Sequence, residues 1–274
     1  MSRSSSLRVI DTMTSHTHRI SLALAALAAM TFAPDAIAAT DDIGTAMSVT
    51  TVVTGKLDAD ERTLKSGDAV FQNETIVTDA NGVGQFQFND QTKLAIGPGS
   101  TVVLDNFVYD SNTSQGKVVI NLTAGALRFI TGKADHNAYE IVTPTATIGV
   151  RGTVFDVYTK TNGEMAVAMI DGAIEVCPKI GLCRVHNVVG KFLHMTPLGA
   201  FSLRDKWDGS FLAGVPFKLA LPFLGDQKNL VPSLRGKTGS IAKYVTVAGT
   251  GIGKAIKTPL TKLPKLKLPK LFGK

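Results

Sequence analysis

The sequence lacks the short motifs that mark several common enzyme classes. Its 274 residues contain no G-x-S-x-G nucleophile elbow and no H-E-x-x-H zinc motif. Gly249–Lys254 has the glycines of a phosphate-binding loop, but Ala248 and Ala255 stand where that loop needs glycine and serine or threonine. The acidic run Asp58–Glu61 lies in a polar stretch, where carboxylates are solvated. We therefore expect neither an enzyme nor a nucleotide or other cofactor.

The sequence also lacks an apolar run long enough to span a bilayer. Its longest, Ile20–Phe32, has 13 residues, whereas a spanning helix needs about 20. Three arginines precede this run: Arg3, Arg8 and Arg19. The small residues Ala36–Ala38 follow it and fit a signal-peptidase site, so residues 1–38 are predicted to be a signal peptide cleaved before Ala39. The start is Met1 or Met13, and the alternative to cleavage is a retained membrane anchor. The mature protein is expected in the periplasm or at the cell surface.

Cysteine is scarce. Cys177 and Cys183 are the only two, and the five residues between them can form a turn, so a disulfide is predicted in the oxidising envelope. Their spacing is not the C-x-x-C of redox motifs, and zinc would need two further soft ligands. His136, His186 and His194 are not spaced as metal ligands, so no metal site is expected.

Acidic residues are missing from the C-terminal end. Residues 39–226 hold 15 Lys and Arg against 20 Asp and Glu, whereas residues 227–274 hold 11 Lys and Arg and no acid. Two Lys-Leu-Pro-Lys-Leu repeats, at 262–266 and 267–271, place prolines that break a helix. A disordered basic tail is therefore predicted over 235–274. Its lysines are candidates for binding an anionic membrane or polymer: Lys254, Lys257, Lys262, Lys265, Lys267, Lys270 and Lys274. The alternatives are a solvated tail or one folded against the acidic body. Few aromatics accompany the lysines, so nucleic acid is not an expected partner.

Short strand-like runs fill residues 39–195. Examples are Val49–Val53, Gly84–Phe88, Val118–Leu122 and Leu127–Ile130, with turn residues such as Asn81-Gly82 between successive runs. In 84–88 the phenylalanines alternate with glutamines, which predicts an apolar and a polar face. An all-β domain, either a roll or solenoid or a sandwich, is therefore predicted. Residues 196–234 are rich in proline, leucine and phenylalanine, and an irregular or partly helical region is predicted there.

A resemblance to a known family covers residues 67–176. Six blocks carry it: Gly67–Val70, Asn73–Thr78, Phe86–Leu94, Ile96–Ser100, Gly125–Phe129 and Thr143–Phe155. In order and spacing they resemble the FecR domain. The resemblance implies an all-β fold of short strands and a role in envelope signalling, because founding members relay an iron-transport signal to a sigma factor. Only 19 residues precede the apolar run, which is short for the cytoplasmic segment of those regulators. A stand-alone exported FecR-domain protein is the closer comparison.

The block 143–155 supplies the candidate binding residues: Thr143, Pro144, Gly149, Arg151, Gly152 and Thr153. The glycines permit positive φ or close backbone approach. The guanidinium of Arg151 is interpreted either as pinning its own turn to Asp156 or Glu140, or as recognising a carboxylate or anionic glycan of a partner.

These observations favour a non-catalytic binding module. Its expected partner is another envelope protein, a glycan or an anionic surface, with a role in signalling or envelope organisation. Two alternatives stay open: an inner-membrane transducer of the sigma-regulating type, and an envelope hydrolase of unknown type.

Overall fold

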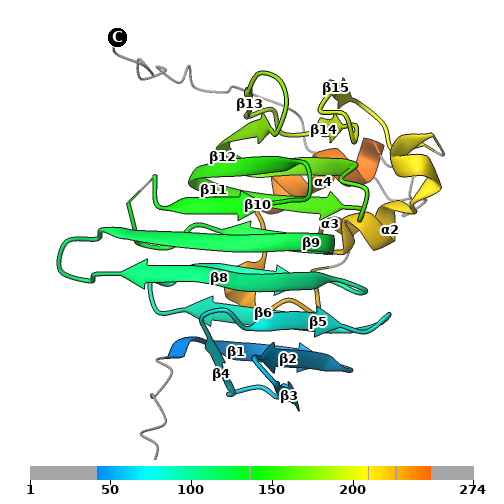
Figure 1. Cartoon of the computed structure of the whole chain (residues 1–274). Helices are drawn as coiled ribbons and strands as arrows, with labels where there is room; N and C mark the ends of the chain where they lie inside the picture. The colour runs from blue at the N-terminus through cyan, green and yellow to red at the C-terminus, as the bar shows by residue number, and fades with distance from the viewer. Residues whose placement is uncertain (1–41, 136, 209, 226, 248–274) are drawn as a thin grey trace, which may run out of the picture. The chain divides into compact units, whose positions relative to one another are not determined.

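The computed structural model describes residues 42–247, except for 136, 209 and 226. The strands of this part belong to one hydrogen-bonded sheet of 15 strands (Figure 1). The predicted all-β fold is confirmed. The strands are β1 (Asp42–Thr50), β2 (Val53–Leu57), β3 (Asp60–Thr63), β4 (Ala69–Phe71), β5 (Thr75–Thr78), β6 (Val83–Phe88), β7 (Lys93–Ile96), β8 (Thr101–Tyr109), β9 (Gly116–Ile130), β10 (Tyr139–Val142), β11 (Ala146–Thr159), β12 (Met165–Pro178), β13 (Arg184–His186), β14 (Phe192–Met195) and β15 (Phe201–Arg204).

Three long strands turn the sheet over on itself. β9, β11 and β12 have 15, 14 and 14 residues, longer than the runs that the sequence indicated. Each contains a glycine with positive φ: Gly125, Gly152 and Gly172. The residues of β9 before Gly125 pair with β8 and β10, and the residues that follow Gly125 pair with β7 and β11. Each long strand therefore contributes to two facing layers.

The pairings give the order of strands in each layer. The first layer runs β3-β2-β5-β8-β9-β10-β11-β12-β13, and the second runs β4-β1-β6-β7-β9-β11-β12-β14-β15. The pair β9–β10 is parallel and its neighbours are antiparallel, so the sheet is mixed.

The main core lies between the layers. Phe86, Phe88 and Phe129 from the second layer belong to the same buried cluster as Ile120 and Ile148 from the first. The alternation of strand residues accounts for this, because every second side chain of each layer faces the other layer.

The C-terminal region covers the outer face of the second layer. It contains short helices: η1 (Phe211–Gly214), α2 (Phe217–Ala220), α3 (Pro222–Gly225), η2 (Pro232–Leu234) and α4 (Thr238–Val247). Phe211, Phe217 and Leu224 pack with Ala166 and Phe192 of the sheet in a second buried cluster. The predicted irregular or partly helical region is confirmed. In Figure 1, α4 lies behind the strands and α2 lies at their right-hand side.

The same covering buries polar residues of the sheet. Gln85 is fully buried. Its amide nitrogen donates to the carbonyl oxygen of Asn229 at 2.9 Å, and its amide oxygen accepts from the nitrogen of Val231 at 2.7 Å. The glutamine of the expected polar face is thus satisfied by the C-terminal region, not by water.

Arg128 forms the strongest of these polar contacts. It extends from β9 beneath the C-terminal region, and its side chain is fully buried. Its Nε and Nη2 bind the two carboxylate oxygens of Asp156 at 2.6 and 2.8 Å. Nη2 also donates to the carbonyl of Phe223, and Nη1 donates to the Gln227 side chain and the carbonyl of Leu234. All three guanidinium nitrogens therefore have partners, as a buried charge requires.

Three boundaries differ from the sequence-based expectation. The run 49–53 is broken at Thr51, whose φ is 56°, so one strand ends at Thr50 and the next begins at Val53. The sheet continues beyond residue 195 through β15. The tail expected from residue 235 contains α4, where Tyr244 is buried and donates to the carbonyl of Met169 at 2.7 Å. Residues 248–274, with the seven candidate lysines, lie outside the described residues, as do residues 1–38. Within the described part, no helix is both long and apolar enough to cross a membrane.

Removing the charge of Arg128 should strongly destabilise the protein. Arg128→Met leaves the Asp156 carboxylate buried without its partner, so the free energy of unfolding should fall by about 3–5 kcal/mol. Urea unfolding followed by circular dichroism measures the change. Lys56→Met is the matched control, because Lys56 pairs with Glu61 at the surface and such a pair contributes about 0–1 kcal/mol. An Arg128→Met loss no larger than that of the control would contradict the role of the buried pair.

Candidate functional site

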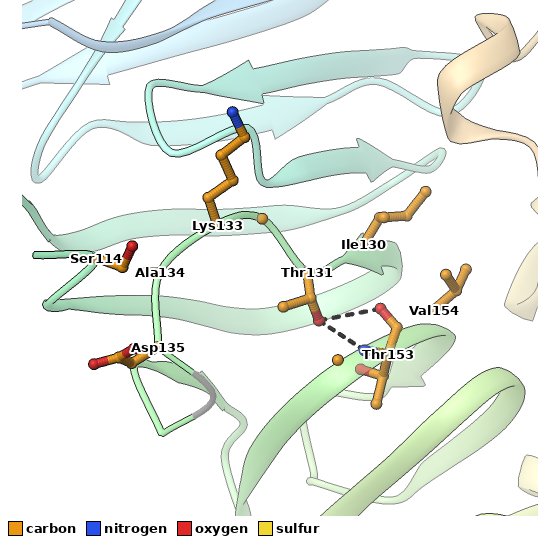
Figure 2. A pocket seen from close by; sticks show the side chains of 10 residues that line it. Ser114, Ile130, Thr131, Lys133, Ala134, Asp135, Thr153 and Val154 are labelled. Atoms are coloured by element: carbon orange, nitrogen blue, oxygen red, sulfur yellow. Dashed lines mark hydrogen bonds between the residues drawn. The ribbon is translucent and has the colours of Figure 1, made fainter. Parts of the chain in front are cut away.

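A hollow of about 410 Å³ lies at the corner where β11 crosses between layers. Three segments line it, from the β8–β9 turn, the end of β9 with the loop that follows, and the β11 corner (Figure 2). The lining residues are Ser114, Ile130, Thr131, Gly132, Lys133, Ala134, Asp135, Gly152, Thr153 and Val154.

Hydrogen bonds between the strands fix one wall of the hollow. The hydroxyl of Thr131 accepts from the backbone nitrogen of Thr153 at 2.8 Å and donates to the carbonyl of the same residue at 3.2 Å. The backbone nitrogen of Thr131 donates to that carbonyl at 3.1 Å. Figure 2 shows the two side-chain bonds as dashed lines. This wall is therefore formed before any ligand binds.

The corner itself requires glycine. Gly152 has φ 58° and Gly172, opposite it on β12, has φ 82°. A Cβ at Gly172 would lie 2.5 Å from the carbonyl oxygen of Gly152, closer than real Cβ contacts allow. The pairing of β11 with β12 shifts register between Arg151 and Val154. The two glycines thus allow both strands to bend together at the hollow.

A buried hydrogen-bond network beneath the hollow fixes the loop that follows β9. The Tyr139 hydroxyl donates to the Asp90 carboxylate at 2.8 Å and accepts from the backbone nitrogen of Ala134 at 2.8 Å. Asp90 also accepts from the hydroxyl of Thr92 at 2.6 Å, and its carbonyl accepts from the nitrogen of Lys133 at 2.7 Å. Burial and the neighbouring Asp90 raise the pKa of Tyr139 well above its usual value. The hydroxyl therefore stays protonated and keeps donating.

The hollow offers mixed polar groups to a ligand. Ser114 and Thr131 supply hydroxyls, and the exposed Lys133 and Asp135 supply an amino and a carboxylate group. The hydroxyl of Thr153 is buried and has no hydrogen-bond partner within the part of the chain that the structure describes. Such an arrangement suits a polar ligand that carries both donors and acceptors.

The candidate residues of 143–155 do not form one site. Gly152 and Thr153 line the hollow, and Arg151 precedes them. Ala146 pairs with Pro178 and Arg151 pairs with Ala173, so Thr143 and Pro144 lie at the other end of the strand. There the Thr143 hydroxyl donates to the carbonyl of Ala146 at 2.9 Å and shapes the turn. Gly149 lies between the two ends.

Arg151 does not bind Asp156. Asp156 is paired with Arg128 on the outer face of the second layer, while Arg151 lies in the part of β11 that belongs to the first. The Arg151 side chain is exposed and forms no ion pair with any residue that the structure describes. The interpretation that it pins its turn to Asp156 was wrong, and among the described residues it forms no ion pair with Glu140, the other acid considered. The corner at Gly152 places the two residues in different layers.

The predicted disulfide between Cys177 and Cys183 is confirmed, with Cα atoms 4.0 Å apart. It closes the loop between β12 and β13. Glu175 has a carboxylate oxygen within 4.8 Å of both sulfurs. Because the sulfurs are bonded to each other, this group does not offer thiolates to a metal ion.

The sequence analysis missed the polar and charged side chains of the hollow other than Thr153: Ser114, Thr131, Lys133 and Asp135. Three of them lie in 131–135, a loop containing one glycine between two strands. That composition is typical of any turn, and the contact with Gly152 depends on the pairing of β9 with β11.

Residues 74–175 match the family model described as FecR protein. These residues are therefore similar to the FecR family, as the sequence predicted. The match includes the whole lining of the hollow and the Arg128–Asp156 pair, but the C-terminal groups that bind Arg128 lie beyond it. No curated protein matched the chain.

Two crystal structures resemble the FecR-domain chain weakly. Both are described as "a putative anti-sigma factor from Parabacteroides distasonis ATCC 8503", with 16% sequence identity and TM-scores of 0.38 and 0.37. Each likeness covers 47% of this chain and 58% of the other. The chain thus spans less than two thirds of those structures, and a likeness at this level carries no argument about its partner.

A buried histidine predicts a pH dependence of stability. His186 in β13 is buried, and its Nε2 has no hydrogen-bond partner among the described residues. Burial lowers its pKa to about 4, against 6.5 for the free side chain, although a hydrogen bond to the backbone of Lys191 partly opposes this. Between these two values the unfolded chain binds a proton that the folded chain does not. Stability should therefore fall as pH decreases through this window, by up to about 1.4 kcal/mol per pH unit from this residue.

Urea unfolding of the wild type and of His186→Leu across that window isolates this contribution. The free energy of unfolding of the wild type minus that of His186→Leu should decrease as the pH is lowered from about 7 towards 4, because only the wild type carries this titration. A difference that does not vary with pH would show that His186 titrates normally in the fold.

Proposed function

We propose that the protein is a non-catalytic module of the bacterial cell envelope, located in the periplasm or at the cell surface. Its FecR domain binds a polar envelope component, a protein or a glycan, in the hollow beside Gly152 and Thr153. The FecR match supports a signalling-related role in the envelope, and this proposal adds the place at which the partner is recognised.

The unpartnered hydroxyl of Thr153 carries the proposal. Buried polar groups nearly always have a hydrogen-bond partner, so an exception beside an open hollow calls for an explanation. A ligand seated in the hollow, with a small local adjustment of the corner, provides a partner for this hydroxyl. The hollow is also preformed by the Thr131–Thr153 bonds and the Asp90–Tyr139 network, so binding costs little ordering.

Charged groups at the rim define the partner's chemistry. Lys133 favours a carboxylate or another anionic group, and Asp135 favours an amine or a hydroxyl. An acidic peptide segment or an anionic glycan satisfies both requirements. The basic residues of 254–274 add a separate attachment to anionic lipid or lipopolysaccharide in this proposal.

Photo-crosslinking in cells tests the hollow as the contact site. A photoreactive residue placed at Lys133 should give a discrete higher-mass adduct, and Asp135→Asn with Thr153→Val in the same chain should reduce its yield several-fold. The matched control is the same residue at Lys218, which is exposed on α2. Lys218 should give no such adduct.

Two results would contradict the proposal. One is an adduct of equal yield from both positions, or one that the two substitutions leave unchanged. The other is turnover of a hydrolase substrate by the purified protein that Asp135→Asn abolishes, since this would favour an envelope hydrolase.

A further inference from the structure

Two neighbouring loops expose large aliphatic side chains. Ile180 and Leu182 lie in the loop between β12 and β13 and are 84% and 85% exposed. Leu198 lies in the turn between β14 and β15 and is 90% exposed. We call these three residues the apolar tip. Aliphatic side chains grouped in this way on a soluble surface mark a contact with another apolar phase.

The apolar tip is held in place from below. The Cys177–Cys183 disulfide closes the first loop, and the backbone nitrogen of Lys179 donates to the carbonyl of Thr145 at 2.8 Å. The two loops touch, because a Cβ built on Gly199 would lie 2.9 Å from the carbonyl oxygen of Ile180. The exposed side chains therefore project from a braced surface, and their exposure does not come from a loose loop.

Basic residues outnumber acidic residues around the apolar tip. Residues 176–204 contain four basic residues and no acid: Lys179, Arg184, Lys191 and Arg204. Lys191 pairs with Asp205 at 3.1 Å. Lys179 and Arg184 flank the tip, are exposed, and form no ion pair with any of the residues described. Two acids border this stretch of the sequence: Glu175, next to the disulfide, and Asp205.

We propose that the apolar tip inserts into the headgroup region of an anionic lipid bilayer. Projecting aliphatic side chains that do not line a groove suit the disordered boundary of a bilayer, which needs no matching shape. Lys179 and Arg184 lie where they would meet lipid phosphates, and each basic residue near such a surface strengthens binding. The hollow lies at the Gly152 corner in the middle of β11, whereas the β12–β13 loop follows the pairing of Ala146 with Pro178 at the start of that strand. In this proposal the hollow stays open to its partner.

Co-sedimentation with vesicles tests this contact. Purified exported protein should pellet with phosphatidylglycerol-rich vesicles and much less with vesicles of phosphatidylcholine alone. Ile180→Ser, Leu182→Ser and Leu198→Ser combined should lower partitioning by about tenfold or more, since three aliphatic side chains lose their apolar contact. Lys179→Gln with Arg184→Gln should lower it by about fivefold or more at low salt, and less at high salt.

Two further variants test whether membrane binding depends on the apolar tip or on another part of the chain. Val108→Ser removes another aliphatic side chain, which is 57% exposed on β8, and should leave partitioning unchanged. A chain ending at Val247 lacks the basic repeats but keeps α4, and its residual binding should still fall on adding the triple substitution. Circular dichroism checks that the triple variant is folded, as expected for exposed positions.

Three results would overturn the proposal: no binding of the wild type to anionic vesicles, wild-type binding by the folded triple variant, or an equal loss with Val108→Ser. Loss of all binding on ending the chain at Val247, with full binding by the triple variant, would assign the membrane contact to the basic repeats instead.

Discussion

The buried ion pair of Arg128 and Asp156 is the constraint on which the rest of the fold depends. Both side chains lie on the outer face of the second layer, which in a bare two-layer sheet would be in water. A guanidinium removed from water needs all its donors satisfied, and the sheet supplies only the Asp156 carboxylate. The other partners are Phe223, Gln227 and Leu234 of the C-terminal region. The pair therefore makes a segment beyond the FecR match part of the same folded unit.

The glycine corners link this unit to the candidate site. β11 carries Asp156 on the second layer and reaches the first layer through Gly152, so one strand connects the covered face to the hollow. The Asp90–Tyr139 network fixes the opposite wall from the core side. Any change that loosens the second layer should thus be felt at the hollow, since packed layers transmit strain.

The fold class, the disulfide and the FecR domain could be predicted from sequence, because strand periodicity, cysteine spacing and the motif at 143–155 are local signals. The partner of Arg128 could not, since Asp156 lies 28 residues away and the remaining contacts about 100. Arg151 illustrates the same limit. Asp156, the nearest acid along its strand, lies in the other layer of the sheet. The bends in β9, β11 and β12 were missed because a glycine within a strand signals a break, a bulge or a corner equally well. The alternation of phenylalanine and glutamine in 84–88 indicated that Gln85 faces away from the main core. It does not show that the C-terminal region covers that face.

Truncation tests the central claim that the C-terminal region is part of the FecR-containing fold. Two chains beginning at Ala39 are compared, one ending at Val247 and one ending at Arg204, with thermal unfolding followed by near-ultraviolet circular dichroism. The chain ending at Val247 should unfold cooperatively near the Tm of the full-length protein. The chain ending at Arg204 should lack a cooperative transition, because Arg128 and the apolar face of the second layer are left uncovered. A cooperative transition of the shorter chain at the same Tm would contradict the account.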